Sequence, residues 1–142
     1  MTTQATKVVF ASHEWLDLAR EVLEDLVAQH GKVGKSFSVC EVFTNAPDGM
    51  IGSDPASGSK NAAWHFCIVD KIVTVGEGEI DSADMAVSVE YEKALPMARR
   101  TYPAFLGWLV MPVIRLLSYL RRKPCPPGYL MDLHNRLALV TK

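Results

Sequence analysis

The chain has 142 residues, of which 49% are hydrophobic and 22% are charged, as in an ordinary globular protein. This length suits one domain, which we expect to span residues 1–142. Lys and Arg number 15 and Asp and Glu 16, which leaves a formal net charge of -1 and no electrostatic signature of nucleic-acid binding.

The cysteines and the N-terminal sequence favour a cytoplasmic location. Cys40, Cys67 and Cys125 are odd in number and lack CxxC or Cys/His metal spacing, which argues against a disulfide framework and a zinc site. In MTTQATKVVFASHEW the only apolar run, Val8 to Ala11, is too short for a secretory signal. We therefore expect a protein of the reducing cytoplasm without a metal or another cofactor.

The first half of the chain predicts one helix followed by strands. Ser12 suits an N-cap and Gly31 follows the end of a helix over 13–30, in which apolar side chains recur at helical spacing. Alternating apolar side chains predict strands at 37–43, 62–69, 72–76 and 85–91. The segment 45–61, rich in Gly, Pro and Ser, predicts a long loop, and Asp70–Lys71 predicts a hairpin turn.

The last predicted strand passes directly into a helical pattern. Glu92–Arg100 predicts a short helix, and a second helix starts at 101–103, ends near Arg122 and contains Gly107 and Pro112 as bend points. Tyr129–Val140 predicts a closing helix. This order indicates an α+β fold with a mostly antiparallel twisted sheet of four to five strands, helices packed on one face and an apolar cavity between the layers.

Three segments of this pattern resemble a known family of lipid-binding domains. They are SFSVCEVF, AAWHFCIVDKIVTVGEGE and SADMAVSVEYEKAL, and together with the leading helix they are similar to the sterol carrier protein type 2-like family. The resemblance covers about residues 12–100. It implies a strand that begins at an Ala-Asp pair and passes into a short helix over an apolar tunnel.

The resemblance further implies non-covalent binding of a sterol, a fatty acyl chain or a similar lipid, without a catalytic apparatus. Residues 101–142 depart from it, because family members commonly carry a glycine-bounded final strand where this chain has the bulky sequence YPAFLGWLVMPVIRLLSYLRRKP. The sequence does not decide whether this part completes the sheet or forms a helical gate, and it does not indicate the oligomeric state.

Apolar and aromatic side chains on the strands and the late helices are candidates for the walls of a lipid pocket. These candidates are Phe43, Trp64, Phe66, Tyr91, Leu95, Trp108 and Met111. Buried aromatic residues are common in any protein core, so the alternative interpretation is that all of them are simply core residues.

Of three polar residues considered for a site, Glu41 and His65 each have a functional and a structural interpretation. Glu41 falls on an apolar strand face, where it is either a head-group anchor or general base with a raised pKa, or a salt-bridged residue at an exposed edge. His65 shares a face with Cys67, which suggests metal or nucleophilic chemistry, or else a hydrogen-bonded sheet histidine. His134, beside charged residues of the closing helix, fits a solvated helix face.

The apolar segment 104–123 raises the question of membrane contact. Pro112 and Arg115 interrupt it, so a core helix is one interpretation. The other is transient contact with a bilayer, in which Arg121, Arg122 and Lys123 meet anionic head groups.

Two further functions compete with a lipid carrier. Small α+β cones that resemble the ketosteroid-isomerase or polyketide-cyclase group also combine a helix, a curved sheet and an apolar pocket. In such an enzyme Glu41, His65 or Tyr91 would transfer a proton to or from a hydrophobic substrate. A purely structural or interaction module is the third possibility.

Overall fold

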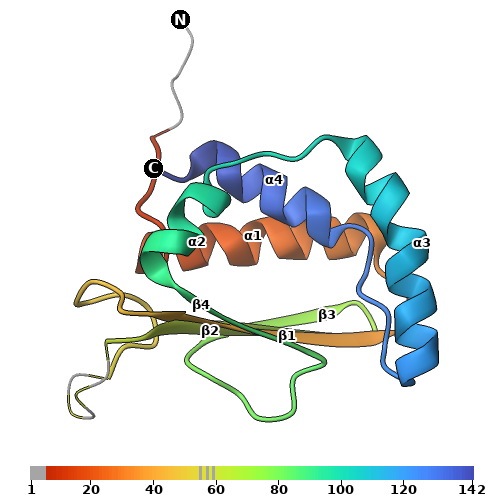
Figure 1. The fold of residues 1–142 in the computed structure, drawn as a ribbon, viewed down its shortest axis with the longest axis horizontal. Coiled ribbons are helices and arrows are strands. Elements are labelled where there is room, and N and C mark those ends of the chain that lie inside the picture. The colour runs from red at the N-terminus through yellow and green to blue at the C-terminus, as the bar shows by residue number, and fades with distance from the viewer. Residues whose placement is uncertain (1–5, 55, 57, 59) are drawn as a thin grey trace, which may run out of the picture.

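The structure, a computed structural model, describes residues 6–54, 56, 58 and 60–142. Its elements are α1 (His13–His30), β1 (Ser36–Thr44), β2 (Ala62–Val69), β3 (Ile72–Glu77), β4 (Met85–Glu90), α2 (Tyr91–Ala98), α3 (Ala104–Arg121) and α4 (Leu130–Val140). Helices α1, α2 and α4 cover one face of the sheet, and α3 stands at its side (Figure 1). The predicted α+β fold with helices on one sheet face is confirmed.

Helix α1 begins and ends where the sequence predicts. The Ser12 hydroxyl oxygen accepts a hydrogen bond from the backbone N–H of Trp15 at 3.2 Å, and the N–H of Gly31 donates to the carbonyl oxygen of Val27 at 2.7 Å. Both bonds satisfy backbone groups that a helix end leaves without partners. The apolar face of α1, which includes Leu23 and Leu26, is buried against the sheet.

The four strands form one sheet in the order β3-β2-β1-β4. β2 and β3 are an antiparallel hairpin, and β1 pairs with β2 in the antiparallel sense. Asp70 and Lys71 form the hairpin turn, and both adopt the positive φ that a primed turn requires. The Asp70 carboxylate accepts a hydrogen bond from the N–H of Gly34, which holds this turn against the segment that precedes β1.

The sheet is mostly antiparallel, as expected, but it is mixed, because β4 pairs with β1 in parallel. After β3 the chain crosses under the sheet on the face away from the helices and enters β4 in the same direction as β3 (Figure 1). Ile80 and Ala83 of this crossover cover the buried Cys40 and Ala63. The Asp84 carboxylate accepts from the backbone N–H of Ser38 at 2.9 Å, which joins the end of the crossover to β1.

The predicted loop 45–61 is anchored at one point in the core. Ile51 is completely buried; its N–H donates to the carbonyl oxygen of Ala11 at 3.0 Å, and its own carbonyl accepts from Ala63 at 2.9 Å. Residues 55, 57 and 59 of this loop lie outside the described residues. The loop is therefore part of the fold and not only a connection.

The predicted helices of the second half are present, with ends displaced by one or two residues. α2 follows β4 without a loop, as the sequence predicts. α3 is one helix that contains both Gly107 and Pro112, and none of its described residues belongs to the buried core. None of the helices in the described part of the chain is long and apolar enough to cross a membrane.

Candidate functional site: an apolar pocket with one carboxylic acid

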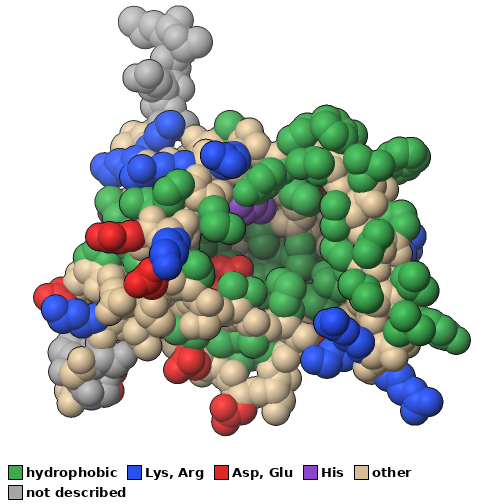
Figure 2. Space-filling model, viewed as in Figure 1, with side chains coloured by type: hydrophobic (Ala, Val, Ile, Leu, Met, Phe, Trp, Pro, Cys, Tyr) green, Lys and Arg blue, Asp and Glu red, His purple; other side chains and the backbone are tan. Residues whose placement is uncertain are grey.

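A pocket of about 240 Å³ lies between the helix-covered face of the sheet and helices α2 and α4. Hydrophobic side chains surround a hollow on this side of the molecule (Figure 2). The lining residues are Phe10, Trp15, Val39, Glu41, Phe43, Trp64, Phe66, Met85, Val87, Val89, Ala94, Met97, Ala98, Leu130, Leu133, His134 and Leu137. Two of these side chains, Glu41 and His134, are titratable, and the rest are apolar or aromatic.

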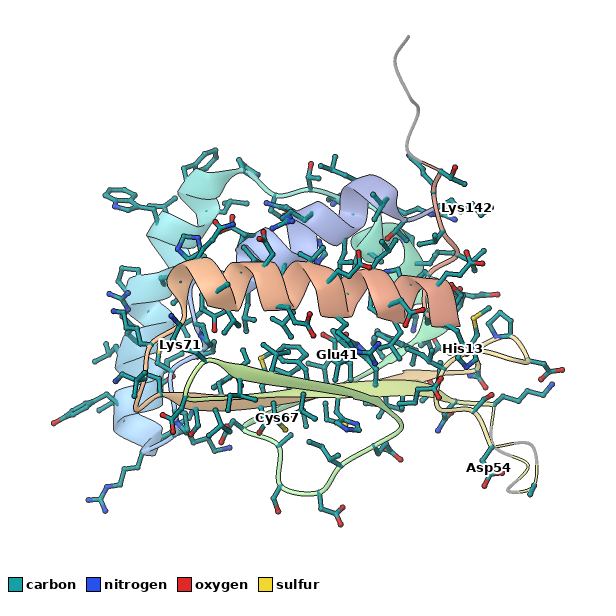
Figure 3. All side chains as sticks on the ribbon, turned by 180° about the vertical axis from the view of Figure 1, so that it is seen from behind. His13, Glu41, Asp54, Cys67, Lys71 and Lys142 are labelled. Atoms are coloured by element: carbon teal, nitrogen blue, oxygen red, sulfur yellow. The ribbon has the colours of Figure 1, made fainter. Side chains whose placement is uncertain are left out.

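The strand register brings Glu41 to the pocket floor. On β1 it faces Trp64 of β2 on one side and Val87 of β4 on the other. Its side chain lies in the layer between the sheet and the helices, whereas Cys67 lies on the opposite side of the sheet (Figure 3). The indole N–H of Trp64 donates a hydrogen bond to the Glu41 carboxyl at 3.0 Å.

Burial raises the pKa of Glu41 above its ordinary value, because the pocket walls remove water from around the carboxyl. The hydrogen bond from Trp64 and the charge of His134 act in the opposite direction and are smaller. Glu41 is only half-buried, but the surface that it exposes faces the pocket. The pocket thus contains a carboxyl group that is shifted towards its neutral form, which can both donate and accept a hydrogen bond.

His134 is the second polar group of the pocket, and it reaches the site from α4. Its Nε2 lies 2.8 Å from the carbonyl oxygen of Arg100, and its ring packs beside Tyr102 with the ring centres 5.2 Å apart. A carbonyl oxygen only accepts, so Nε2 carries the proton in this bond. The histidine ring is therefore held in place at the rim of the pocket by the segment that connects α2 to α3.

The structure brings three of the predicted wall residues together and separates the other four from the pocket. Phe43, Trp64 and Phe66 line it. The Tyr91 hydroxyl donates to the carbonyl oxygen of Phe10 at 2.9 Å within the core, and Leu95 packs at the edge of that core. These two side chains therefore belong to the core and not to the pocket lining.

Trp108 and Met111 lie outside the pocket because α3 does not cover the sheet. Trp108 is 78% exposed to solvent. Met111 lies on the inner side of α3, where it lines a second hollow. These two candidates for the pocket wall therefore do not line the pocket.

His65 is separated from Glu41 by the thickness of the sheet. Its Nδ1 lies 2.9 Å from the carbonyl oxygen of Gly78, and its ring covers Gly76, where a Cβ atom would lie 2.6 Å from Nε2. This is the hydrogen-bonded sheet histidine of the structural interpretation. Among the described residues, no group of three or more His, Cys, Asp or Glu side chains could hold a metal ion.

The sequence interpretation missed His134, although a signal for it exists. His134 belongs to the series Leu130, Leu133, His134 and Leu137, whose spacing of three and four residues places all of them on the buried side of α4. Asp132 and Arg136, its charged neighbours in sequence, are exposed. Their charges were the reason for interpreting His134 as part of a solvated helix face.

Comparison with known proteins does not extend this description. No protein-family model matches the chain, and no curated protein or solved structure matches it significantly.

Proposed function

We propose that this protein binds a hydrophobic small molecule with one uncharged polar group, and that a single fatty acyl chain is the best-fitting class. The observation that carries the proposal is an apolar pocket whose floor presents one carboxyl group with a raised pKa. A neutral Glu41 can hydrogen-bond the hydroxyl or carbonyl end of such a ligand, while the apolar walls accommodate its chain.

The size of the pocket favours a slender ligand. Its volume of about 240 Å³ is below the ~300–1,000 Å³ of sites that enclose drug-sized molecules. A rigid sterol needs more space than this, whereas a flexible chain can enter by one end and leave the remainder along the apolar rim. Met85 and Met97 in the walls can adapt to such a chain, because methionine side chains are flexible and polarisable.

The resemblance to sterol carrier protein type 2-like domains supports the same proposal. That resemblance implies a strand that starts at an Ala-Asp pair and passes into a helix over the ligand. Here Ala83 and Asp84 precede β4, β4 continues directly into α2, and Ala94 and Met97 of α2 line the pocket. The three cysteines of the chain are free, which supports a cytoplasmic location for the activity.

A steric test uses Val87, which lines the pocket and is 39% exposed. Val87→Trp would fill the pocket without crowding the closed core, so we expect a fluorescent fatty acid to bind at least about tenfold more weakly. The matched control is Val33→Trp, because Val33 is 78% exposed and lies outside the pocket.

The two tryptophan variants should unfold at similar temperatures, so that the comparison isolates binding. Native mass spectrometry of protein purified from cells adds a second measurement, in which wild type carries a lipid-sized mass and Val87→Trp does not. Equal binding of the probe by wild type and both variants would exclude this pocket as the lipid site.

A second candidate function is proton transfer on a hydrophobic substrate, as in an isomerase or a cyclase. The observation that favours it is the pairing of Glu41 with His134 at one pocket, since the charge of His134 acts on the pKa of Glu41. Neither His65 nor Tyr91 is available for this role, because His65 lies across the sheet and the Tyr91 hydroxyl is bound in the core.

Glu41→Gln separates the two functions. The amide keeps a hydrogen-bonding group of the same shape but cannot accept a proton. A carrier should retain most of its fatty-acid binding and turn over no hydrophobic ketone, either as wild type or as the variant. An enzyme should show turnover in the wild type that falls by roughly 10²- to 10⁴-fold in Glu41→Gln while binding persists.

A further inference from the structure

Helix α3 exposes an unusually wide apolar surface. Its exposed side chains include Phe105, Trp108, Val113, Leu116, Tyr119 and Leu120. Met111, Ile114 and Ser118 are half-buried and face the rest of the molecule. Leu109, Val110 and Leu117 are exposed as well. Because an α-helix has 3.6 residues per turn, these nine exposed apolar positions together spread around more than half of the circumference of α3. The apolar stripe of a helix that packs on a protein is normally narrower, at about 100°.

All charged residues in α3 and in the segments on either side of it, 93–131, are positive. Residues 93–131 contain no Asp or Glu, although they include Arg99, Arg100, Arg115 and the run Arg121–Lys123. Figure 2 shows hydrophobic side chains over α3 and Lys and Arg side chains beside its lower end, which is the end at Arg121. The chain as a whole has a net charge of -1, so this distribution is local and not a consequence of a basic protein.

A second hollow, of about 460 Å³, lies between the inner side of α3 and the segment that joins α1 to β1. Its lining includes Lys32, Lys35, Arg115 and His30 and contains no carboxylate. The floor is apolar and includes Phe37 and Met111. Cationic side chains around an apolar floor suit a ligand that has an anionic group on a hydrocarbon body.

We propose that α3 docks this protein on an anionic lipid bilayer, with its apolar surface among the acyl chains and Arg121, Arg122, Lys123 and the basic hollow at the head groups. An interfacial helix of this kind presents aromatic and aliphatic side chains to the lipid and basic side chains to the anionic surface. Trp108 and Tyr119 of α3 are both exposed, and aromatic side chains of this kind are enriched where an interfacial helix meets lipid. This inference goes beyond the ligand pocket, and it holds whether or not that pocket carries a lipid.

A bilayer fits α3 better than a second copy of the chain does. In a symmetric dimer the same surface meets itself, so α3 would face α3. Whether the two helices ran parallel or antiparallel, residues 93–131 of the partner would offer no acidic side chain to the cations at Arg121–Lys123. A fluid apolar medium also accepts a surface that curves around more than half of a helix, whereas a single flat interface covers only part of it.

The direct test mixes the protein with vesicles of phosphatidylcholine alone and with vesicles that contain equal amounts of phosphatidylcholine and phosphatidylglycerol. Trp15 and Trp64 are buried and Trp108 is exposed, so a blue shift of tryptophan fluorescence on docking reports on Trp108. We expect the shift and co-sedimentation with the anionic vesicles, with weaker binding at high salt. Trp108→Phe should lose the shift and still co-sediment.

Two pairs of variants distinguish docking through α3 from nonspecific binding of exposed apolar or basic side chains to vesicles. Leu120→Ser removes an apolar side chain of α3 that is 65% exposed, and Leu139→Ser removes one on α4 that is 66% exposed. We expect the first to weaken co-sedimentation about tenfold and the second to leave it unchanged. Both residues are exposed, so neither change should impair folding.

The charge pair follows the same design. Replacing Arg121, Arg122 and Lys123 by Gln should weaken binding to anionic vesicles by on the order of 100-fold, since each cation near the surface contributes about fivefold. Replacing Lys7, Lys60 and Lys142 by Gln removes the same charge away from α3, and Lys142 lies at the opposite end of the molecule (Figure 3). This control triple should retain binding.

Three outcomes would overturn the proposal. They are failure to bind anionic vesicles, equal loss of binding in both members of either pair, and a dimer in sedimentation equilibrium without lipid that Leu120→Ser converts to a monomer. The last result would assign α3 to a second copy. The pocket variant Val87→Trp should still bind vesicles, so a failure of the lipid-pocket proposal is distinguishable from a failure of docking.

Discussion

At the scale of single residues, the raised pKa of Glu41 makes stability depend on pH. Burial raises this pKa above 4.5 in the folded protein, so the folded state binds the proton more tightly than the unfolded chain. The free energy of unfolding therefore falls as pH rises from 4.5 through the folded pKa, by up to about 1.4 kcal/mol per pH unit in that window. Below 4.5 both states are protonated and the effect is absent.

Glu41→Gln should remove this dependence, because an amide does not ionise. Urea denaturation across a pH series should show the variant gaining stability relative to wild type as pH rises above 4.5. Glu21→Gln, on the exposed side of α1, controls for the loss of one negative charge. Parallel curves for wild type and Glu41→Gln would contradict a buried carboxyl that resists ionisation.

The sequence predicted the place of Glu41 but not its partners. Strand alternation puts Glu41 on the same face as Phe37, Val39 and Phe43, and that parity survives any change in strand order. The hydrogen bond from Trp64 depends on the register of β1 against β2, and the approach of His134 depends on how α4 crosses the sheet. Neither distance can be read from local spacing.

At the scale of elements, a glycine explains how the loop after β1 fits against the sheet. Gly52 has a φ of +66°, and a Cβ atom there would lie 2.5 Å from the carbonyl oxygen of Ala63 and 2.7 Å from the backbone nitrogen of Gly78. Gly49, in the same loop, has a φ of +79° and no atom within 4 Å of such a Cβ.

Alanine substitutions at these two glycines should therefore differ in cost. Gly49→Ala should lower the free energy of unfolding by about 1–2 kcal/mol, through the left-handed backbone alone. Gly52→Ala adds a clash with backbone atoms, which cannot rotate away as a side chain can. It should therefore lower the free energy of unfolding by at least about 1 kcal/mol more than Gly49→Ala does. Urea denaturation midpoints of both variants measure this difference, and equal costs would mean that the loop does not pack against Ala63 as described.

The elements themselves were predictable to within one or two residues, because caps and alternation are local signals. α1 follows from Ser12 and Gly31, and the hairpin follows from the two apolar runs around Asp70–Lys71. The direction of β4 was not predictable in the same way. A strand that follows a hairpin usually pairs with the hairpin's last strand in the antiparallel sense. Here the crossover takes the chain to the opposite edge of the sheet, where Asp84 binds Ser38 and β4 pairs with β1 in parallel.

At the scale of the whole molecule, the sequence predicted the two layers but not the position of α3. Amphipathic helices such as α1 and α4 show which side they bury, because their apolar residues form a stripe. α3 is apolar on most sides, so its pattern does not tell which side packs on the protein and which side is left exposed. That ambiguity is the physical reason why Trp108 was a candidate for the pocket wall, whereas the structure leaves it exposed to solvent.

The segment before α1 and the C-terminal end of α4 are far apart in the sequence but are joined by hydrogen bonds in the helix layer. The N–H of Val8 donates to the carbonyl oxygen of Val140 at 2.8 Å, and the indole N–H of Trp15 donates to the buried Thr141 hydroxyl at 3.2 Å. Trp15 also lines the pocket. The orientation of one pocket wall thus depends on a residue 126 positions away in the sequence.

Thr141→Val tests this closure, because it keeps the shape of the side chain and leaves the Trp15 N–H buried without an acceptor. We expect a loss of about 1–3 kcal/mol in the free energy of unfolding. In a Trp15→Phe background the same change should cost less, since no indole N–H remains, and the double-mutant cycle should give a coupling on the order of 1 kcal/mol. Additive costs would show that the two side chains do not interact. A coupling together with weaker fatty-acid binding by Thr141→Val would link the closure of the fold to the pocket, because the released indole of Trp15 can then turn into the pocket.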